Sequence, residues 1–199
     1  MTGDRWLIAG LGNPGPSYAG NRHNAGYLAA DVLAARAGAR FRAGKFRVMA
    51  AEGRVAGSGV IIVKPLTFMN DSGVAVAGIS GYYRLGAGLI VVVHDELDLP
   101  FGAIRLKRGG GDSGHNGLRS VTAHLGTPEY YRVRIGIGRP PGRMDPAVYV
   151  LRDFSAAERK ELPFLLDRAA DAVEALLADG LTAAQNALHG GGVAGTGGG

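Results

Sequence analysis

Cysteine is absent from the 199-residue chain, and so is any long hydrophobic run. Without cysteine the protein can hold no disulfide, no thiolate nucleophile and no cysteine-ligated zinc or iron–sulfur site. No window approaches the roughly 18 consecutive apolar residues of a membrane helix, and the short apolar run after Asp4 and Arg5 is unlike a secretory signal. We therefore expect a cytoplasmic protein whose chemistry depends on His, Asp, Glu, Asn or Ser side chains.

The composition predicts one compact domain with a basic surface. Hydrophobic residues make up 46% of the chain, which is enough for one core at this length, and no shift in composition marks a second domain. Lysine and arginine outnumber aspartate and glutamate by 22 to 17, and the net charge of +5 suits a polyanionic partner without requiring one. Residues 190–199 are mostly glycine, so we expect the domain to span residues 1–189 and the remainder to form a disordered tail.

Short apolar runs alternate with segments of helical spacing. The runs at 7–11, 60–63 and 89–93 are aliphatic or β-branched, a pattern typical of buried strands, while 21–37 and 71–84 carry Ala, Leu and Val at helical spacing. This alternation predicts an α/β domain with helices on the faces of a sheet. Further expected elements are strands near 46–51, 103–107 and 131–138, a helix near 118–125, and a C-terminal helical hairpin that turns at Gly180 and begins with a capping box of Ser155 and Glu158.

The segment from Gly10 to Gly15 formally matches G-x-G-x-x-G, the fingerprint of dinucleotide-binding enzymes. That fingerprint needs backbone N–H groups at an opening helix, whereas Pro14 and Pro16 flank Gly15 and remove them. The acidic partner expected about 20 residues later is matched in spacing only by Asp31, inside a helical segment. We therefore interpret the segment as a turn and keep an NAD-dependent enzyme as an alternative.

Polar residues gather after several predicted strands, where sites form in open α/β sheets. They are Asn13 and 22–24 after the first strand, 67–70 after the second and 94–98 after the third, together with a glycine-rich loop at 109–117. These segments offer a His–Asp pairing surrounded by asparagines. An imidazole can take a proton from water near neutral pH, and a carboxylate can fix its tautomer. Asparagine amides can position water and bind a peptide backbone without adding charge.

Two other kinds of site stay open at this point. Ser-His-Asp catalysis lacks its G-x-S-x-G elbow, although Ser72 or Ser113 could still serve as a nucleophile. A metal site could draw on the side chains of 94–98, but successive strand residues point to opposite faces, so these converge only with a turn. Taken singly, each of these residues also has a structural explanation as a cap, a turn or a solvated charge.

Six short motifs follow one another between Gly10 and Pro140, and the likeness that they carry covers about residues 5–189. They are Gly10–Gly15, Arg22–Gly26, Lys64–Asn70 with Ser72 and Gly73, His94–Asp98, Gly109–Gly117 and Arg134–Pro140. In this order they resemble the motifs of bacterial-type peptidyl-tRNA hydrolases, and six in order are far more specific than one. The resemblance implies a single globular α/β domain in three layers (α/β/α), with a twisted mixed β-sheet flanked by helices.

The resemblance also implies roles for individual residues. His23 is expected to be the catalytic base and Asp95 its carboxylate partner. Lys107 and Arg134 are expected to contact tRNA, at its terminal phosphate, which a pair of cations would suit. Ser113 departs from the glycine that is common at its position, which affects loop flexibility rather than chemistry.

The remaining expected site residues bind the peptide and position water. The resemblance implies that three asparagines line this part of the site, that a methionine forms an apolar wall, and that a tyrosine lies nearby. These residues are Asn13, Asn70, Asn116, Met69 and Tyr18.

The implied reaction is hydrolysis of the ester between a peptide and the 3′-terminal ribose of tRNA, which recycles tRNA from stalled or aborted translation. No metal or organic cofactor is expected, and the expected partner of this monomer is the acceptor end of peptidyl-tRNA. A non-catalytic RNA-binding protein on the same fold is the alternative, as in relatives that assist RNA splicing. The presence of His23 and Asp95 argues against it, because a binding protein needs no base.

Overall fold

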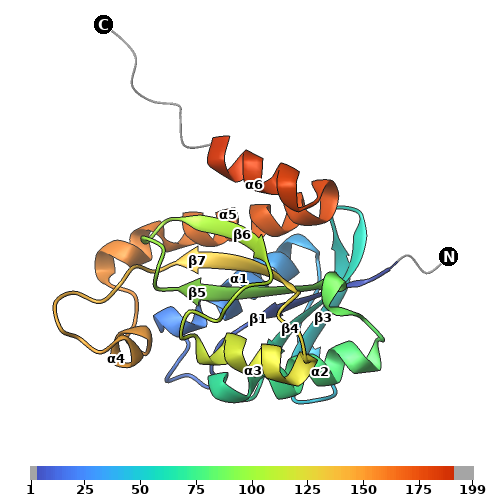
Figure 1. The fold of residues 1–199 in the computed structure, drawn as a ribbon, viewed down its shortest axis with the longest axis horizontal. Helices are drawn as coiled ribbons and strands as arrows, with labels where there is room; N and C mark the ends of the chain where they lie inside the picture. The colour runs from blue at the N-terminus through green and yellow to red at the C-terminus, as the bar shows by residue number, and fades with distance from the viewer. Residues whose placement is uncertain (1–3, 191–199) are drawn as a thin grey trace, which may run out of the picture.

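A seven-stranded mixed sheet runs through the centre of the computed structural model, which describes residues 4–190 (Figure 1). The strands span Trp6–Gly10 (β1), Arg42–Ala43 (β2), Val48–Val55 (β3), Ser58–Pro65 (β4), Ile90–Glu96 (β5), Ile104–Arg108 (β6) and Tyr131–Gly136 (β7). Their order across the sheet is β2-β3-β4-β1-β5-β7-β6. The four central strands β4, β1, β5 and β7 are parallel, whereas β3 and β6 run antiparallel to their neighbours.

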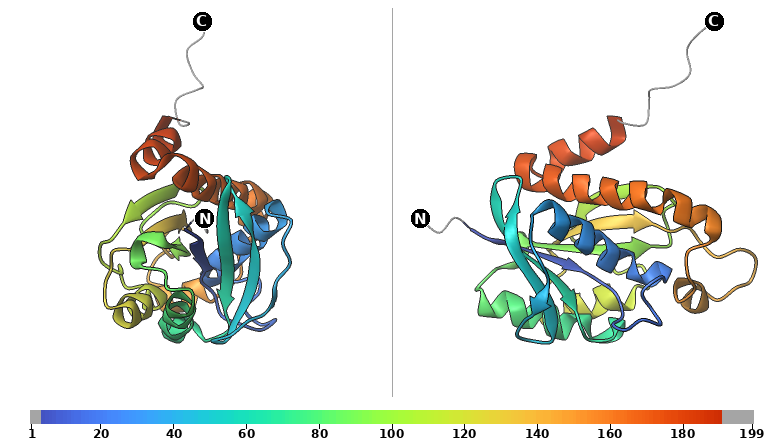
Figure 2. Two further views of the ribbon diagram at one scale, coloured as in Figure 1. Left: turned by 90° about the vertical axis from the view of Figure 1, so that its right-hand side faces the viewer. Right: turned by 180° about the vertical axis from the view of Figure 1, so that it is seen from behind.

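Helices cover both faces of the sheet and give three layers. The α-helices span Ala25–Arg36 (α1), Ser72–Tyr82 (α2), Asn116–Leu125 (α3), Pro146–Val150 (α4), Ala156–Asp179 (α5) and Leu181–Gly190 (α6), and short 3-10 helices span Arg22–Asn24 (η1), Met69–Asp71 (η2) and Ala87–Leu89 (η3). Helices α1 and α5 lie together on the face seen in the right-hand view of Figure 2, and α2 and α3 lie on the other. The alternation of β1 separates these layers, because Ile8 packs into the α1–α5 core while Leu7 and Ala9 pack into the α2–α3 core.

The four parallel strands end at one edge of the sheet, at Gly10, Pro65, Glu96 and Gly136. Every residue of β5 is buried, as expected for a central strand covered on both faces. The polar segments that follow these strands therefore meet at this edge, which is where sites form in such sheets.

Close backbone packing brings the start of α1 onto the same edge. A Cβ atom added at Gly26 would lie 2.3 Å from the Val93 carbonyl oxygen and 2.5 Å from the Leu11 backbone nitrogen. Glycine, which has no side chain, is needed for this approach. Because η1 directly precedes α1, its residue His23 is held against the end of β5.

The predicted fold class is confirmed, and the main predicted strands and helices form in the predicted order. The C-terminal hairpin turns at Gly180, and Ser155 and Glu158 form the predicted capping box. The two-residue strand β2 and the single-turn helix α4 were not predicted. The predicted tail lies, apart from Gly190, outside the described residues. Within residues 4–190, none of the helices has the length and apolar character needed to cross a membrane.

Candidate active site

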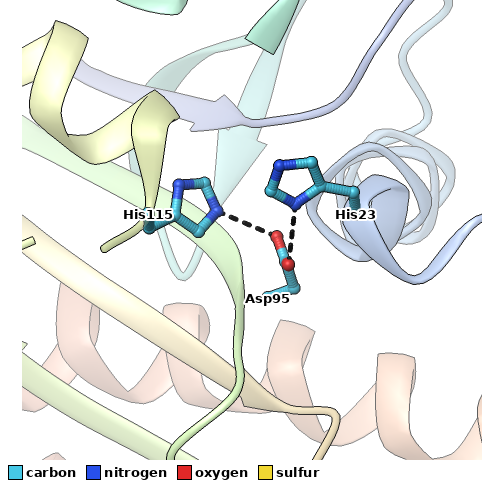
Figure 3. A group of neighbouring side chains, drawn as sticks. All are labelled: His23, Asp95 and His115. Carbon is cyan, nitrogen blue, oxygen red and sulfur yellow. Dashed lines mark hydrogen bonds and ion pairs between the residues drawn. The ribbon is translucent and has the colours of Figure 1, made fainter. Parts of the chain in front are cut away.

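His23 and Asp95 meet at the edge where the parallel strands end (Figure 3). The Nδ1 atom of His23 lies 2.8 Å from Oδ2 of Asp95. Because a carboxylate can only accept a hydrogen bond, Nδ1 carries the ring proton and donates it to Asp95. The other ring nitrogen, Nε2, points away from Asp95 in Figure 3. The arrangement is that of an imidazole free to take a proton from water while a carboxylate fixes its tautomer.

Both groups are withdrawn from solvent, with the His23 side chain 12% exposed and that of Asp95 2% exposed. Burial disfavours the charged imidazole, but the charge and hydrogen bond of Asp95 outweigh it and raise the pKa of His23 above 6.5. Burial also disfavours the carboxylate, yet His23 and His115 hold the pKa of Asp95 well below its ordinary value. Asp95 therefore stays ionised, and His23 is the member of the pair that changes charge.

His115 completes the group, although it is not among the site residues predicted from the sequence. Its Nε2 atom lies 2.9 Å from Oδ1 of Asp95, and its side chain is 8% exposed. As the N-cap of α3, its Nδ1 atom accepts the backbone N–H groups of Gly117 at 3.1 Å and Leu118 at 3.3 Å. A backbone N–H can only donate, so Nδ1 is unprotonated and the one ring proton sits on Nε2. The two oxygens of Asp95 thus accept from two different imidazoles.

His94, the residue before Asp95, is buried behind this group. Its Nδ1–H donates to the Asp95 carbonyl oxygen at 2.7 Å, and its ring packs edge-on against that of His115 with centroids 5.2 Å apart. Burial, followed by the nearby His115, lowers the pKa of His94 to about 3. His94 is therefore neutral at ordinary pH and acts as a packing partner rather than as a base.

The metal site considered for 94–98 does not form in the described part of the chain, because Glu96 and Asp98 each pair with an arginine. The group within residues 4–190 that offers clustered metal ligands is instead His23, Asp95 and His115, whose ligand atoms lie within 4.8 Å of one another. Ligation through Nε2 of His115 would place the ring proton on Nδ1, where two backbone N–H groups already point. The hydrogen bonds therefore suit proton transfer better than metal binding.

Asn13 ties two parts of the site together. Its backbone N–H donates to Asn24 Oδ1 and its carbonyl accepts from Asn24 Nδ2, both at 2.9 Å. Its side-chain Oδ1 accepts the backbone N–H of Met69 at 2.7 Å, which fixes the amide orientation. The Nδ2 group of Asn13 has no hydrogen-bond partner within residues 4–190. Asn24, also not predicted as a site residue, sets the position of Asn13.

Met69 and Asn116 both lie at the start of α3. Met69 is buried, and a Cβ added at Gly117 would come within 2.6 Å of its sulfur, so the methionine forms a wall against the start of α3. Asn116 is exposed as the first residue of α3 and lines the pocket beside His23.

Neither Asn70 nor Tyr18 is among the residues that line the pocket beside His23. Asn70 is exposed on η2, and no hydrogen bond within residues 4–190 joins it to His23 or Asp95. Tyr18 packs edge-on against the exposed ring of Phe68, with centroids 6.2 Å apart.

A pocket of about 260 Å³ opens beside His23 and Asp95, the pair called the dyad from here on. Its lining includes His23, Asp95 and His115, and the start of α4 forms part of its wall. Two further carboxylates, Glu96 and Asp145, also line it, and no lysine or arginine does. The pocket lining therefore carries carboxylates and imidazoles but no side chain that is a permanent cation.

Lys107 on β6 and Arg134 on β7 supply cations on neighbouring strands. The register pairs Lys107 with Arg132 and Arg134 with Arg105. Arg134 donates to Glu96 Oε1 from Nε at 3.0 Å and Nη2 at 2.9 Å. Burial, then Arg134 and Arg132, lower the pKa of Lys107, so the three cations lie close together. Lys107 has no ion pair within residues 4–190.

The glycine-rich loop, residues 109–117, is held in place by hydrogen bonds from Arg132. Fully buried Arg132 donates to the carbonyl oxygens of Gly110 and Gly111. Ser113 adopts a φ of 51°, a left-handed conformation that glycine reaches at lower cost. The serine therefore adds local strain at a position that suits glycine, without a hydrogen bond to His23.

The two rival sites considered from sequence find no support in the geometry. Ser72 Oγ donates to the Met69 carbonyl oxygen at 2.7 Å and is fully buried, so it is not an available nucleophile. After β1 the chain forms turns, and the first α-helix begins only at Ala25 rather than at Gly15. The helix N-terminus that would bind a pyrophosphate is therefore missing from its expected place.

Comparisons with known proteins show which proteins this chain is similar to. A family model described as peptidyl-tRNA hydrolase matches residues 7–194. The peptidyl-tRNA hydrolase of Frankia casuarinae is 61% identical over 189 residues, 94% of this chain and 96% of its own length. That of Streptomyces coelicolor is 58% identical over 193 residues, again 94% and 96%. A crystal structure of peptidyl-tRNA hydrolase from Acinetobacter baumannii matches with a TM-score of 0.86 at 38% identity, covering 92% of this chain and 93% of that one.

Proposed function

Because this chain belongs to the peptidyl-tRNA hydrolase family, we propose that it hydrolyses the ester between a peptide and the 3′-terminal ribose of tRNA, recycling tRNA from stalled or aborted translation. The observation that carries the proposal is the bond from His23 Nδ1 to Asp95, which leaves Nε2 free at a pocket. The pocket lies where the parallel strands end, as expected for an enzyme of this architecture.

The proposed reaction is a general-base hydrolysis. His23 Nε2 removes a proton from a water in the pocket, and the water oxygen attacks the ester carbonyl carbon. The bond to the ribose oxygen then breaks, the electron pair leaves on that oxygen, and the imidazolium returns a proton to it. General-base catalysis contributes about 10²–10⁴-fold, and positioning of the water adds to it. The ionised Asp95 stabilises the imidazolium that forms between these steps.

We assign recognition of the peptide to the side chains of Asn13 and Asn116. The free Nδ2 group of Asn13 and the exposed amide of Asn116 would bind the last peptide bond of the substrate and the developing oxyanion. An aminoacyl-tRNA lacks that peptide bond, so it would leave these dipoles without partners. Met69 supplies the apolar wall beside them.

Single-turnover hydrolysis of peptidyl-tRNA beside aminoacyl-tRNA tests the proposed function. We expect kcat/KM to favour peptidyl-tRNA by about 10²-fold or more, because a site built to bind a substrate's hydrogen-bonding groups rejects an analogue without them. Asn13→Ala should reduce this ratio by slowing the peptidyl substrate. Absence of hydrolysis, or equal rates on both substrates, would contradict the assignment.

Affinity for tRNA should depend on Lys107 more than on Arg134. Lys107→Ala is expected to raise KM and to lower the slope of log KM against log salt concentration by about 1, the value for one lost phosphate contact. Arg134→Ala should change the slope less, because Glu96 already binds this guanidinium. The measurement is KM for peptidyl-tRNA over a series of salt concentrations.

The matched control is Arg54→Ala on β3, which removes a charge near the opposite end of the sheet. It should leave the salt slope unchanged. If Lys107→Ala and Arg54→Ala give the same slope as the unmodified protein, the phosphate role of Lys107 is wrong.

We propose that the enzyme acts as a monomer in the cytoplasm, where its substrate is made. No observation favours the non-catalytic alternative, since an ionised carboxylate and an oriented imidazole at a pocket serve a reaction rather than binding alone.

A further inference from the structure

Asp95 is shared by two imidazoles that differ in the contacts of their second ring nitrogen. His23 donates to one carboxylate oxygen and keeps a free Nε2 lone pair. His115 donates to the other oxygen, and both of its ring nitrogens are engaged. The rings lie 4.9 Å apart between centroids, so the charge of one is felt by the other.

The N-terminus of α3 selects one tautomer of His115. The backbone N–H groups of Gly117 and Leu118 both point at Nδ1, so this atom accepts and the ring proton lies on Nε2. His115 is thereby oriented as a donor to Asp95.

The donor from His115 limits how strongly Asp95 acts on His23. A carboxylate that accepts a second hydrogen bond is less basic, and its orientation is fixed because each oxygen has its own donor. Without His115, the full negative charge of Asp95 would act on His23 alone. The imidazolium of His23 would then be too stable, and less of the neutral base would exist near pH 7.

The other titratable and charged groups around His115 and Asp95 have hydrogen-bond or ion-pair partners of their own. From β5, Glu96 is bound by Arg134, and His94 is neutral. From α4, the Asp145 side chain accepts the backbone N–H of Ala147.

From the glycine-rich loop, Asp112 accepts the Gly114 backbone N–H and pairs with Arg119, and from β7 Arg132 binds loop carbonyl oxygens. A buried carboxylate that paired with one histidine alone would lack a second imidazole donor. Asp95 has one, because His115 also donates to it.

We propose that His115 is a positioning residue for the hydrolysis: with its tautomer fixed by α3, it binds one Asp95 oxygen and directs the other toward His23. This inference rests on the proposed role of His23. It adds that the start of the helix carrying Asn116 also sets the strength of the base.

Two substitutions separate the two bonds that His115 makes. In His115→Asn, the amide oxygen can take over the helix cap from Nδ1, but the side chain is too short to replace the Nε2 donor. In His115→Gln, the amide nitrogen can reach toward Asp95 in place of Nε2, but the cap is lost. His124→Asn, on the same helix, is the control for replacing a histidine by asparagine at a position without a bond to Asp95.

For His115→Asn we expect the acid limb of the pH profile of kcat/KM to move up by about one pH unit, the size of one lost charge-assisted hydrogen bond. Activity should fall about tenfold on that limb and recover at alkaline pH, where His23 is neutral again. His115→Gln should keep the limb near its original position but lower Tm. His124→Asn should change neither.

Histidine NMR in the unmodified protein tests the same inference without an activity assay. The ring proton of His115 should lie on Nε2, and the pKa of His23 should be above 6.5. A ring proton on Nδ1 of His115 would overturn the inference, as would a loss of activity in His115→Asn that is equal at every pH. If the protein does not hydrolyse peptidyl-tRNA at all, the proposed function fails while the NMR result still decides the tautomer of His115.

Discussion

Replacing His23 by alanine should lower kcat on peptidyl-tRNA by about 10²–10⁴-fold, because the variant loses the general base. The loss should be in kcat rather than in substrate affinity, since the assigned tRNA cations lie on β6 and β7. Added imidazole should restore part of the rate in the cavity that the side chain leaves. Single-turnover kinetics and an equilibrium tRNA-binding assay measure the two quantities separately.

The control for this variant is His124→Ala, which removes a histidine from α3 outside the pocket. It should retain normal turnover. Substantial turnover by His23→Ala would show that another group activates the water, and the proposed mechanism would then be wrong.

Asp95→Asn should lower kcat about as much as His23→Ala does, and the reason lies in the hydrogen bonds around Asp95. His115 must donate from Nε2, so the amide oxygen of the new asparagine faces His115 and its NH₂ group faces His23. The Nδ1 atom of His23 must then accept, which moves the ring proton to Nε2, the nitrogen needed as the base. In serine proteases the corresponding wrong tautomer lowers kcat about 10⁴-fold, and we expect a loss of about 10²–10⁴-fold here.

The pH dependence of the residual activity separates this effect from misfolding. Asp95 raises the pKa of His23, so the unmodified enzyme loses activity as the pH falls through a value above 6.5. Asp95→Asn removes the negative charge, so the acid limb of the variant should move to lower pH. An unchanged limb would mean that the titrating group is not His23.

Much of the fold was predictable from local pattern, because β1, β4 and β5 each contain a run of buried apolar residues. β5 is the clearest case, with every residue buried from Ile90 to Glu96. The two-residue strand β2 and the single turn of α4 were missed because each is too short to show periodicity. Their positions depend on tertiary contacts, such as the pairing of Arg42 with Ala50.

The polar strand ends predicted a His–Asp pairing, but only the resemblance of the motifs assigned it to His23 and Asp95, which are 72 positions apart in the chain. His115 and Asn24 were missed for different physical reasons. Histidine is an uncommon N-cap, so its place before Asn116 was not recognised as a cap that also reaches Asp95. Asn24 resembled an ordinary cap, and its bonds to Asn13 depend on how the turn after β1 folds back.

The most direct test of the dyad is the single-turnover rate of the double variant His23→Ala/Asp95→Asn beside the two single variants. If Asp95 acts only through His23, the double variant should be no slower than His23→Ala alone, because residues that act as a unit have non-additive effects. A rate reduced by the product of the two single losses would contradict the account, since Asp95 would then contribute to hydrolysis independently of His23.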